Sequence, residues 1–267
     1  MSLFINSFAV IRQHLSAVVG DLIMGTFASG TSTTGVHTML RKGDGYYNEH
    51  HYRCYIYGGT NIGEEREVSD WTLTSPAATL TFDPAFTTAI DVTSQYELHY
   101  IFTEDEYRKA INMAINALAG KYLIAKTNAS ITLVDDIYEY TLPDGFEFID
   151  RIITEDEEDS GIFYADDVID SRDWGLISPR KLKLHESRYS ITEDKDLKIE
   201  GQGRQETVNA DSDVIYLPPD WLVAKAITML PKNKIMSNKL DATYHQALLD
   251  ASKEPSSWPN PTAQRVI

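Results

Sequence analysis

The segment Phe102–Leu123, "FTEDEYRKAINMAINALAGKYL", predicts a long amphipathic helix that begins directly after a β-like run. Thr103 is a suitable N-cap, and Glu106 three residues later completes a capping box that satisfies two backbone amides. Apolar side chains then recur at helical spacing on one face, which gives these helix-packing residues: Tyr107, Ile111, Ala114, Ile115 and Leu118. Because alanines keep this face slim, we expect the helix to pack closely against other helices.

β-like sequence occurs on both sides of this helix. Residues 46–101 contain short aromatic or alternating runs separated by Gly and Pro turn signals, which predict a small antiparallel β module. Residues 129–216 contain further runs of this kind and the acidic stretch "EDEEDSGIFYADDVIDSRD". We expect a second β-rich module in which the acidic stretch forms a loop in solvent.

Helical spacing returns near the two ends of the chain. It predicts a first helix from about Phe4 to Val19. A Gly-, Ser- and Thr-rich segment follows, which is either an extended linker or a weak pair of strands, and the linker is favoured. Pro219 and Pro231 bracket another helix, and a last one is predicted to end near Lys253. The remaining residues contain three prolines and predict an extended tail.

The resulting prediction is an α+β fold. It consists of a helical bundle of about four helices with two antiparallel β-rich inserts and an extended C-terminal tail. Its parts are an N-terminal helix and linker (1–45), a β module (46–101), the central helix (102–128), a second β-rich module with the acidic loop (129–216), the C-terminal helices (217–253) and a partner-docking tail (254–267).

The net charge restricts the possible partners. At −16 over 267 residues, the surface repels nucleic-acid phosphates and anionic membranes, so a DNA-coating role is disfavoured. A ring through which DNA passes without sticking remains compatible with this charge. Cys54 is the only cysteine, which excludes an internal disulfide and indicates a reducing compartment. The sequence has no run of about 18 apolar residues, so we expect no membrane span.

The sequence predicts no catalytic, cofactor or metal site. It contains no phosphate-binding glycine motif, no G-x-S-x-G and no H-E-x-x-H, and nothing singles out a pair among its 40 acidic residues. An enzyme is therefore the less favoured class. His50, His51 and Cys54 are loosely spaced for a metal, but a half-buried strand explains them better.

The acidic stretch faintly resembles a calcium loop. Asp156 could take the first position of the motif. The third and fifth positions require Asp or Asn but hold Glu158 and Ser160, and the twelfth requires Glu but holds Asp167. A solvated acidic loop is the favoured interpretation.

The tryptophans are candidates for partner contacts, because Trp is enriched at protein interfaces. Trp71, Trp174 and Trp221 have the alternative of filling small cores. Trp258 lies in the Pro-rich tail and has no core of its own, so we expect it to dock on a neighbour.

Several stretches from Tyr46 to the end resemble those of the neck, or head-to-tail adaptor, proteins of tailed bacteriophages. They are "GEEREVSDW", "LTFDPAFTTAI", "YELHYIFTEDEYRKAINMAIN", "YEYTLPDGFEFIDRI" and "IYLPPDWLVAKAITML". A C-terminal extension that contains Pro259, Pro261, Arg265 and Val266 adds to the likeness.

This resemblance implies a structural virion protein without catalytic residues or cofactors. It would form a homo-oligomeric ring, usually of about twelve subunits, beneath the portal protein at the head–tail junction, after assembly in the cytoplasm of a bacterial host. The helical region would frame the ring, the tail would bind the portal or a neighbouring subunit, and the β modules would face another neck or tail protein. DNA would pass nearby without specific binding.

Two alternatives remain open. One is another virion role, as a tail terminator or a collar or fibre-attachment protein. The other belongs to a different class, a carbohydrate- or peptidoglycan-active virion enzyme. A cleft with two carboxylates of separated pKa would favour that enzyme.

Overall fold

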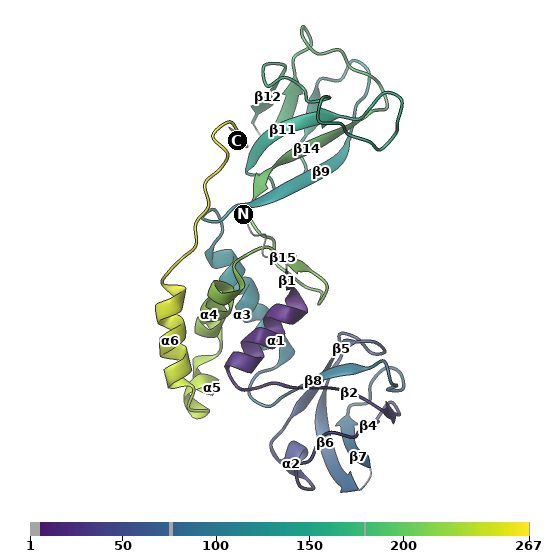
Figure 1. Ribbon diagram of the computed structural model, residues 1–267, viewed down its shortest axis with the longest axis vertical. Coiled ribbons are helices and arrows are strands. Elements are labelled where there is room, and N and C mark those ends of the chain that lie inside the picture. The colour runs from purple at the N-terminus through teal and green to yellow at the C-terminus, as the bar shows by residue number, and fades with distance from the viewer. Residues whose placement is uncertain (1–5, 75–76, 179, 267) are drawn as a thin grey trace. The chain divides into compact units, whose positions relative to one another are not determined.

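The computed structural model describes residues 6–74, 77–178 and 180–266. The predicted helix start at Phe4 and the last residue of the predicted tail, Ile267, lie outside this range. The described residues form two compact units: unit 1 comprises 1–117 and 207–254, and unit 2 comprises 118–206 and 255–267. Figure 1 shows the elements of both units.

The prediction of a bundle of about four helices with β inserts is wrong. The described residues are mostly β, with sixteen strands in four sheets, and the six helices hold only 22% of them. The helical segments near the chain ends are real but short. The Gly-, Ser- and Thr-rich segment, for which a linker is the favoured interpretation, contributes strands, in line with the other interpretation.

Unit 1 contains a seven-stranded antiparallel sheet in the order β2-β8-β5-β6-β7-β4-β3. Its strands, in chain order, are β2 (Ile23–Thr26), β3 (Ser29–Gly30), β4 (Thr34–His37), β5 (Arg53–Gly58), β6 (Glu65–Thr74), β7 (Ala77–Asp83) and β8 (Gln95–His99). The four runs predicted between residues 46 and 101 are confirmed as β5 to β8. A short helix, α2 (Tyr46–Glu49), precedes β5.

This sheet closes on itself through residues 23–30. β2 pairs with β8, the amide of Phe27 donates to the carbonyl of Ser94 at 3.1 Å, and the amide of Ala28 donates to that of Val36 at 2.8 Å. β3 then pairs with β4. Residues 23–30 therefore pair with β8 at one end of the sheet and with β4 at the other, which closes the sheet.

The linker prediction failed because aromatic rings occupy the space beside the small residues. A Cβ on Gly25 would lie 2.7 Å from the hydroxyl of Tyr96, and one on Gly35 would lie 2.4 Å from the ring of Phe27. Glycine at these positions lets the rings of Phe27 and Tyr96 pack with centroids 4.3 Å apart in the core. The low β propensity of this segment is thus overridden by packing.

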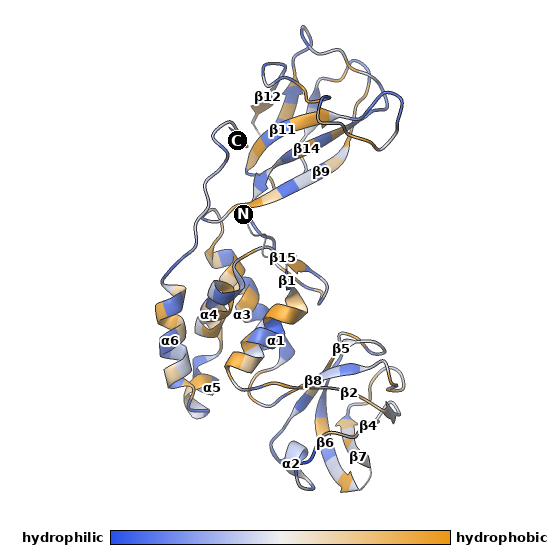
Figure 2. Cartoon of the chain, viewed as in Figure 1, coloured by the Kyte–Doolittle hydropathy of each residue, from blue (hydrophilic) through white to orange (hydrophobic). Residues whose placement is uncertain are grey.

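Five helices accompany the sheet in unit 1, and β1 (Asn6–Ser7) pairs with β15 (Val214–Ile215) beside them. The helices are α1 (Phe8–Val18), α3 (Glu104–Ala117), α4 (Pro219–Met229), α5 (Lys232–Ser237) and α6 (Asp241–Ala251). α4 contacts α1, α3 and α6, so it lies at the centre of this group. Figure 2 shows hydrophobic residues beside polar ones along α1, α3 and α4.

The central helix is shorter than the predicted 102–128. α3 ends at Ala117, and β9 begins at Ile124. Gly120 has φ +78°, a conformation that L side chains rarely adopt and that commonly follows a helix end. Past this glycine, the sequence "IAKTNASIT" alternates between the two faces of a strand rather than continuing the helical period.

Unit 2 is built from two antiparallel sheets that share one core. The four-stranded sheet has the order β16-β11-β14-β9, and the three-stranded sheet has the order β10-β13-β12. The strands are β9 (Ile124–Thr132), β10 (Glu139–Thr141), β11 (Phe148–Thr154), β12 (Trp174–Ile177), β13 (Lys181–Leu184), β14 (Asp196–Gly203) and β16 (Gln264–Arg265). Ile152 and Ile199 from the larger sheet pack with Trp174 and Leu182 from the smaller one.

Candidate interaction surfaces

A buried ionic cluster joins four parts of unit 1. Arg12 on α1 donates from Nε and Nη2 to Glu97 on β8, at 3.0 and 2.9 Å, and from Nη1 and Nη2 to Asp211 in the segment before β15. The side chains of Arg12 and Glu97 are fully buried. Glu104 at the start of α3 lies 3.6 Å from Nη1. A buried guanidinium must be paired, so this cluster fixes α1 against the sheet.

A second buried carboxylate fixes the connection from β8 to α3. Asp21 accepts hydrogen bonds from the amides of Tyr100, Ile101 and Phe102 at 2.7, 2.9 and 2.9 Å. It also accepts one from the hydroxyl of Tyr107 on α3 at 2.8 Å, and burial raises the pKa of that hydroxyl far above its ordinary value. The turn between sheet and helix therefore has no spare donors with which to rearrange.

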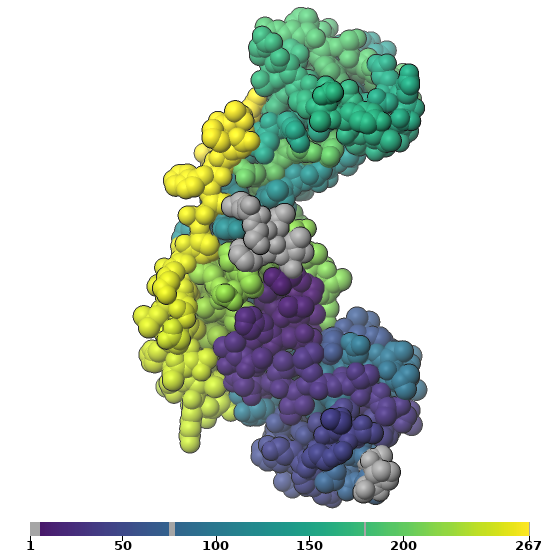
Figure 3. All heavy atoms as spheres, in the orientation of Figure 1, coloured from purple at the N-terminus to yellow at the C-terminus, as the bar shows by residue number. Residues whose placement is uncertain are grey.

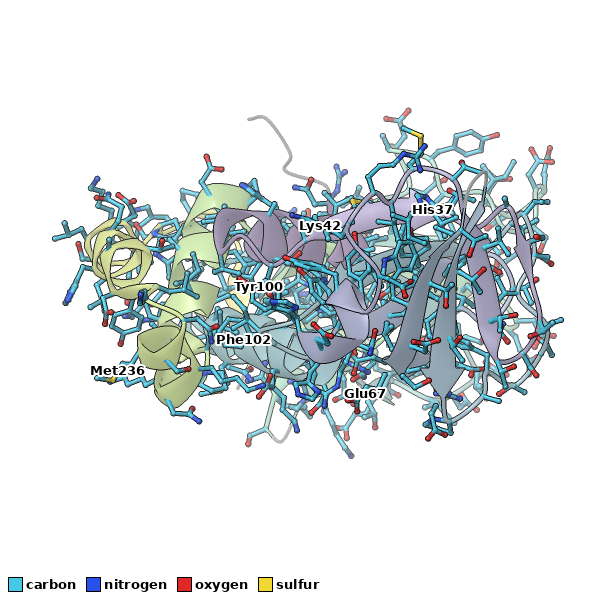
Figure 4. The ribbon with its side chains drawn as sticks, turned by 90° about the horizontal axis from the view of Figure 1, so that it is seen from below. His37, Lys42, Glu67, Tyr100, Phe102 and Met236 are labelled. Atoms are coloured by element: carbon cyan, nitrogen blue, oxygen red, sulfur yellow. The ribbon has the colours of Figure 1, made fainter. Side chains whose placement is uncertain are left out.

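The capping box predicted at the start of α3 is confirmed. The amide of Thr103 donates to Oε2 of Glu106 at 2.9 Å, and the amide of Glu106 donates to Oγ1 of Thr103 at 3.1 Å. Lys234 on α5 donates to the same Oε2 at 2.7 Å and lies over the ring of Phe102. Figure 4 labels Phe102 and, farther along α5, Met236. The cap thus also anchors α5.

The predicted helix-packing residues are buried inside this one chain. Tyr107, Ile111, Ala114 and Ile115 lie on α3 with exposures of 2% or less, and Leu118, just past its end, is 1% exposed. α3 contacts α1 and α4 of the same unit. This face therefore holds unit 1 together, and it is not accessible to another subunit.

An open groove of about 520 Å³ lies among α1, α4 and α6. Val223, Ala224 and Ile227 of α4 and Ala247 of α6 supply apolar lining and are 4–8% exposed. Val18 and His14 of α1 and two carboxylates, Asp220 and Asp250, complete it. Its size is within the ~300–1,000 Å³ typical of binding clefts. An apolar side chain with a hydrogen-bond donor at its edge fits such a groove.

The predicted tail is anchored to unit 2 rather than free. Ser257 is hydrogen-bonded to the backbone of Lys121 and Leu123, and the amide of Asn260 donates to Oε1 of Gln202 at 3.0 Å. Farther along, β16 pairs with β11, and Arg265 lies opposite Phe148.

The five predicted partner-binding residues therefore have different positions. Val266 packs against the core of unit 2, and Arg265 is part of its sheet. Trp258 is 86% exposed between the two anchors, and Pro259 and Pro261 lie in the same irregular stretch. Figure 3 shows the segment that follows α6, in yellow, on the molecular surface. Of the five, Trp258 is the large apolar side chain presented to solvent, while Arg265 is exposed within the sheet.

The other tryptophans are core residues. Trp71 is fully buried in the closed sheet, Trp174 is 3% exposed in unit 2, and Trp221 is 7% exposed on α4. The indole nitrogen of Trp221 donates to the carbonyl of Ala251 at 3.1 Å, which ties α4 to the end of α6.

The weaker metal candidates are not brought together. Cys54 is buried in the core, where burial raises the pKa of its thiol, while the side chain of His51 is 81% exposed and lies 3.5 Å from Glu67. His50 stacks on Tyr46 instead, with ring centroids 4.4 Å apart. Within the three described ranges, no group of three or more His, Cys, Asp or Glu residues could hold a metal ion.

The acidic loop uses its polar groups to fold itself. The carboxylate of Glu155 accepts from the amides of Gly161 and Asp196 and from Ser160, which lowers its pKa. Lys195 donates to the carbonyls of Asp156 and Glu157 at 2.6 and 2.9 Å.

The residues of the calcium-like pattern also make hydrogen bonds within the loop. Oδ1 of Asp156 accepts from the amides of Glu158 and Asp159, so this carboxylate closes a turn. The carbonyl of Asp167 pairs with the amide of Thr154. These residues support the loop and do not converge on one point.

Carboxylates with raised pKa lie elsewhere. Burial raises the pKa of Glu65, Glu104 and Asp150, but none of the three lines the groove. Nor does any of them line a second cavity, of about 720 Å³, which lies beside the acidic loop and is lined in part by Glu155 and Tyr189. Neither the groove nor this cavity therefore holds one of the three carboxylates with raised pKa, which a glycoside-cleaving enzyme would need as its general acid.

The groove was not predicted from the sequence, although one signal points to it. α4 is apolar nearly all round, and such a helix needs neighbours on every side. Its neighbours α1, α3 and α6 leave part of it uncovered, and only the tertiary arrangement shows where.

Comparisons of the chain with protein-family models and with curated proteins gave no match. Within the described residues, no helix has both the length and the apolar character needed to cross a membrane.

Proposed function

We propose that this chain is a structural component of a tailed-phage virion, a head-to-tail connector that binds through its surfaces and catalyses no reaction. It joins a homo-oligomeric ring, of about twelve copies in the family that the sequence resembles, between the portal and the tail. The observation that carries the proposal is the exposure of Trp258 on an anchored segment.

An exposed indole on an ordered backbone is a candidate anchor for a partner, because Trp is enriched at protein interfaces. Trp258 is exposed to 86%, yet hydrogen bonds at Ser257 and Asn260 hold the backbone on both sides of it. A pre-ordered aromatic anchor loses little conformational entropy on binding, so this arrangement favours a protein–protein contact. This exposed indole carries no group that transfers a proton or attacks a substrate.

The fixed connection between sheet and helices supports the same role. The carboxylates of Asp21 and Glu97 hold α1 and the start of α3 against the closed sheet, with buried hydrogen bonds throughout. A connector must keep the surfaces that meet different partners at fixed positions within each of its units. Buried, satisfied networks provide that rigidity.

The way in which the C-terminal segment acts differs from a free tail. Arg265 pairs with Phe148 in a sheet and Val266 packs on the core of unit 2, so the partner contact falls to the exposed Trp258, flanked by Pro259 and Pro261. The net charge of −16 supports a ring that DNA crosses without binding, since like charges repel.

Binding to portal rings tests this proposal. Purified wild-type protein is mixed with portal protein, and the particles are imaged by electron microscopy. The expected result is an added ring on one face of the portal. W258A should give portals without that ring, whereas M236A, which removes an exposed apolar side chain (68%) from α5, should behave as wild type. Portals that stay bare with the wild-type chain would overturn the proposal.

A further inference from the structure

We propose that Trp258 of one copy inserts into the groove among α1, α4 and α6 of a second copy. This inference deepens the proposed function, because it names the contact that would make the ring. It joins two features of the described residues that have no common explanation within one chain: an exposed indole and an open apolar groove.

The chemistry of the two surfaces is complementary. An indole has an apolar body and one N–H donor at its edge. The groove offers the apolar side chains of Val223, Ala224 and Ile227, and at its polar part the carboxylates of Asp220 and Asp250. Asp220 is exposed in the first turn of α4, where its carboxylate can accept the indole N–H.

The charges of the two surfaces also match. The stretch "PSSWPNPTAQRV", residues 255–266, contains Arg265 and no acidic residue, although the whole chain carries −16. It is therefore a part of the chain that can approach the acidic edge of the groove without repulsion. Between other surfaces of two copies, the net charge opposes association.

Such a contact forms a ring where the rotation from copy to copy closes, and an open filament where it does not. Trp258 belongs to unit 2 and the groove to unit 1, so the two sides of the contact are different surfaces. An open chain of copies joined head to tail keeps one unused indole at one end and one unused groove at the other until the assembly closes. A symmetric pair formed by one surface would stop at two copies.

The mass of the protein in solution, measured without portal, tests the contact. The variants are W258A, which removes the indole, and A242W, which adds a ring at an exposed position lining the groove. Each should weaken self-association by roughly thirtyfold or more, the loss expected for an anchoring tryptophan at an interface centre. L249A, at a position on α6 that is 64% exposed and does not line the groove, should associate as wild type.

Mixing the two variants gives the decisive result. W258A keeps a functional groove and A242W keeps a functional indole, so an equal mixture should form one-to-one dimers that grow no further. V18E, which places a charge at an exposed groove position, repeats the A242W arm with a different substitution. Self-association of W258A equal to wild type, or a mixture that stays monomeric, would overturn the inference.

The two proposals fail separately. A wild-type chain that remains monomeric at its highest soluble concentration and on the portal overturns the groove contact. If that monomer still binds the portal, the connector role stands without it. Rings that form in solution but never bind the portal would support the groove contact and overturn the connector role.

Discussion

Arg12 and Glu97, 85 residues apart in the sequence, are joined by two hydrogen bonds and are both fully buried. This pair holds the first helix against the closed sheet. Since Asp211 contacts the same guanidinium from a third segment, the cluster depends on Arg12 more than on any one carboxylate.

Replacing Arg12 should therefore destabilise unit 1 strongly. R12M leaves Glu97 and Asp211 buried without their cation, which typically costs about 3–5 kcal/mol. K109A breaks a solvent-exposed pair with Asp105 on α3 and should cost no more than about 0.5 kcal/mol. Urea unfolding, with hydrogen exchange in α1 and β8 to resolve unit 1, measures both. Equal effects of the two substitutions would contradict the importance of the buried cluster.

The N-cap of α3 should contribute measurably on its own. T103A removes the hydroxyl that accepts the amide of Glu106 and should cost about 1 kcal/mol. T103S keeps that hydroxyl and serves as the matched control. Hydrogen exchange should accelerate in the first turn of α3 in T103A and change little in T103S. Unchanged protection in T103A would show that Lys234 alone holds this end.

Unit 1 should lose stability in mild acid because of His99. Burial lowers the pKa of His99 to about 4, although its Nε2 lies 3.4 Å from Oε2 of the buried Glu97, and neither ring nitrogen makes a hydrogen bond. Between its ordinary pKa of about 6.5 and 4, the unfolded chain binds a proton that the folded chain does not, so stability is present above this window and falls as the pH is lowered through it. The full effect is about 3 kcal/mol, from the difference of about 2.5 pKa units.

The variant H99F isolates this contribution. Phenylalanine keeps the edge-to-face packing on Tyr107 and cannot titrate. The free energy of unfolding of unit 1 should fall less in H99F than in wild type from pH 6.5 to 4. Parallel pH profiles would assign the acid sensitivity to the surrounding carboxylates instead.

Unit 2 should not tolerate a side chain at Gly203. A Cβ there would lie 1.8 Å from the carbonyl oxygen of Gly145, so G203A must displace the backbone and should cost about 1–3 kcal/mol or more. Gly175 on β12 has no atom within 4 Å of a built Cβ, so G175A should be neutral or slightly stabilising. Thermal unfolding monitored by hydrogen exchange in β11 and β14 compares them.

Local signals in the sequence predicted the local structure well. The capping box at Thr103, the strands from Arg53 to His99 and the prolines around α4 all act over a few residues, and all appear as expected. The errors came from long-range packing. Strands β2 to β4 exist because the ring of Tyr96, 71 residues after Gly25, and the ring of Phe27 that stacks on it leave room only for small residues, which no local propensity encodes.

Of the two candidate surfaces, one could be recognised from the local sequence and the other could not. Trp258 could be recognised because a bulky aromatic in a Pro-rich stretch is unusual on its own. The groove could not, since Val18, Ala224 and Ala247 come from three helices spread over the chain. The sequence also does not reveal that Arg265 and Val266 return to a sheet, because their partners lie on β11 and in its core.

The chain passes between the two units three times, since unit 2 is inserted between the two parts of unit 1 and each unit recruits a late segment. During synthesis, Asp211 follows Arg12 after 199 residues, a delay of about 10–40 s at ~5–20 residues per second. The closed sheet can form early, but α4 and α6 emerge among the last elements. The groove therefore forms only after α6 has emerged from the ribosome, whereas the closed sheet can form well before that point.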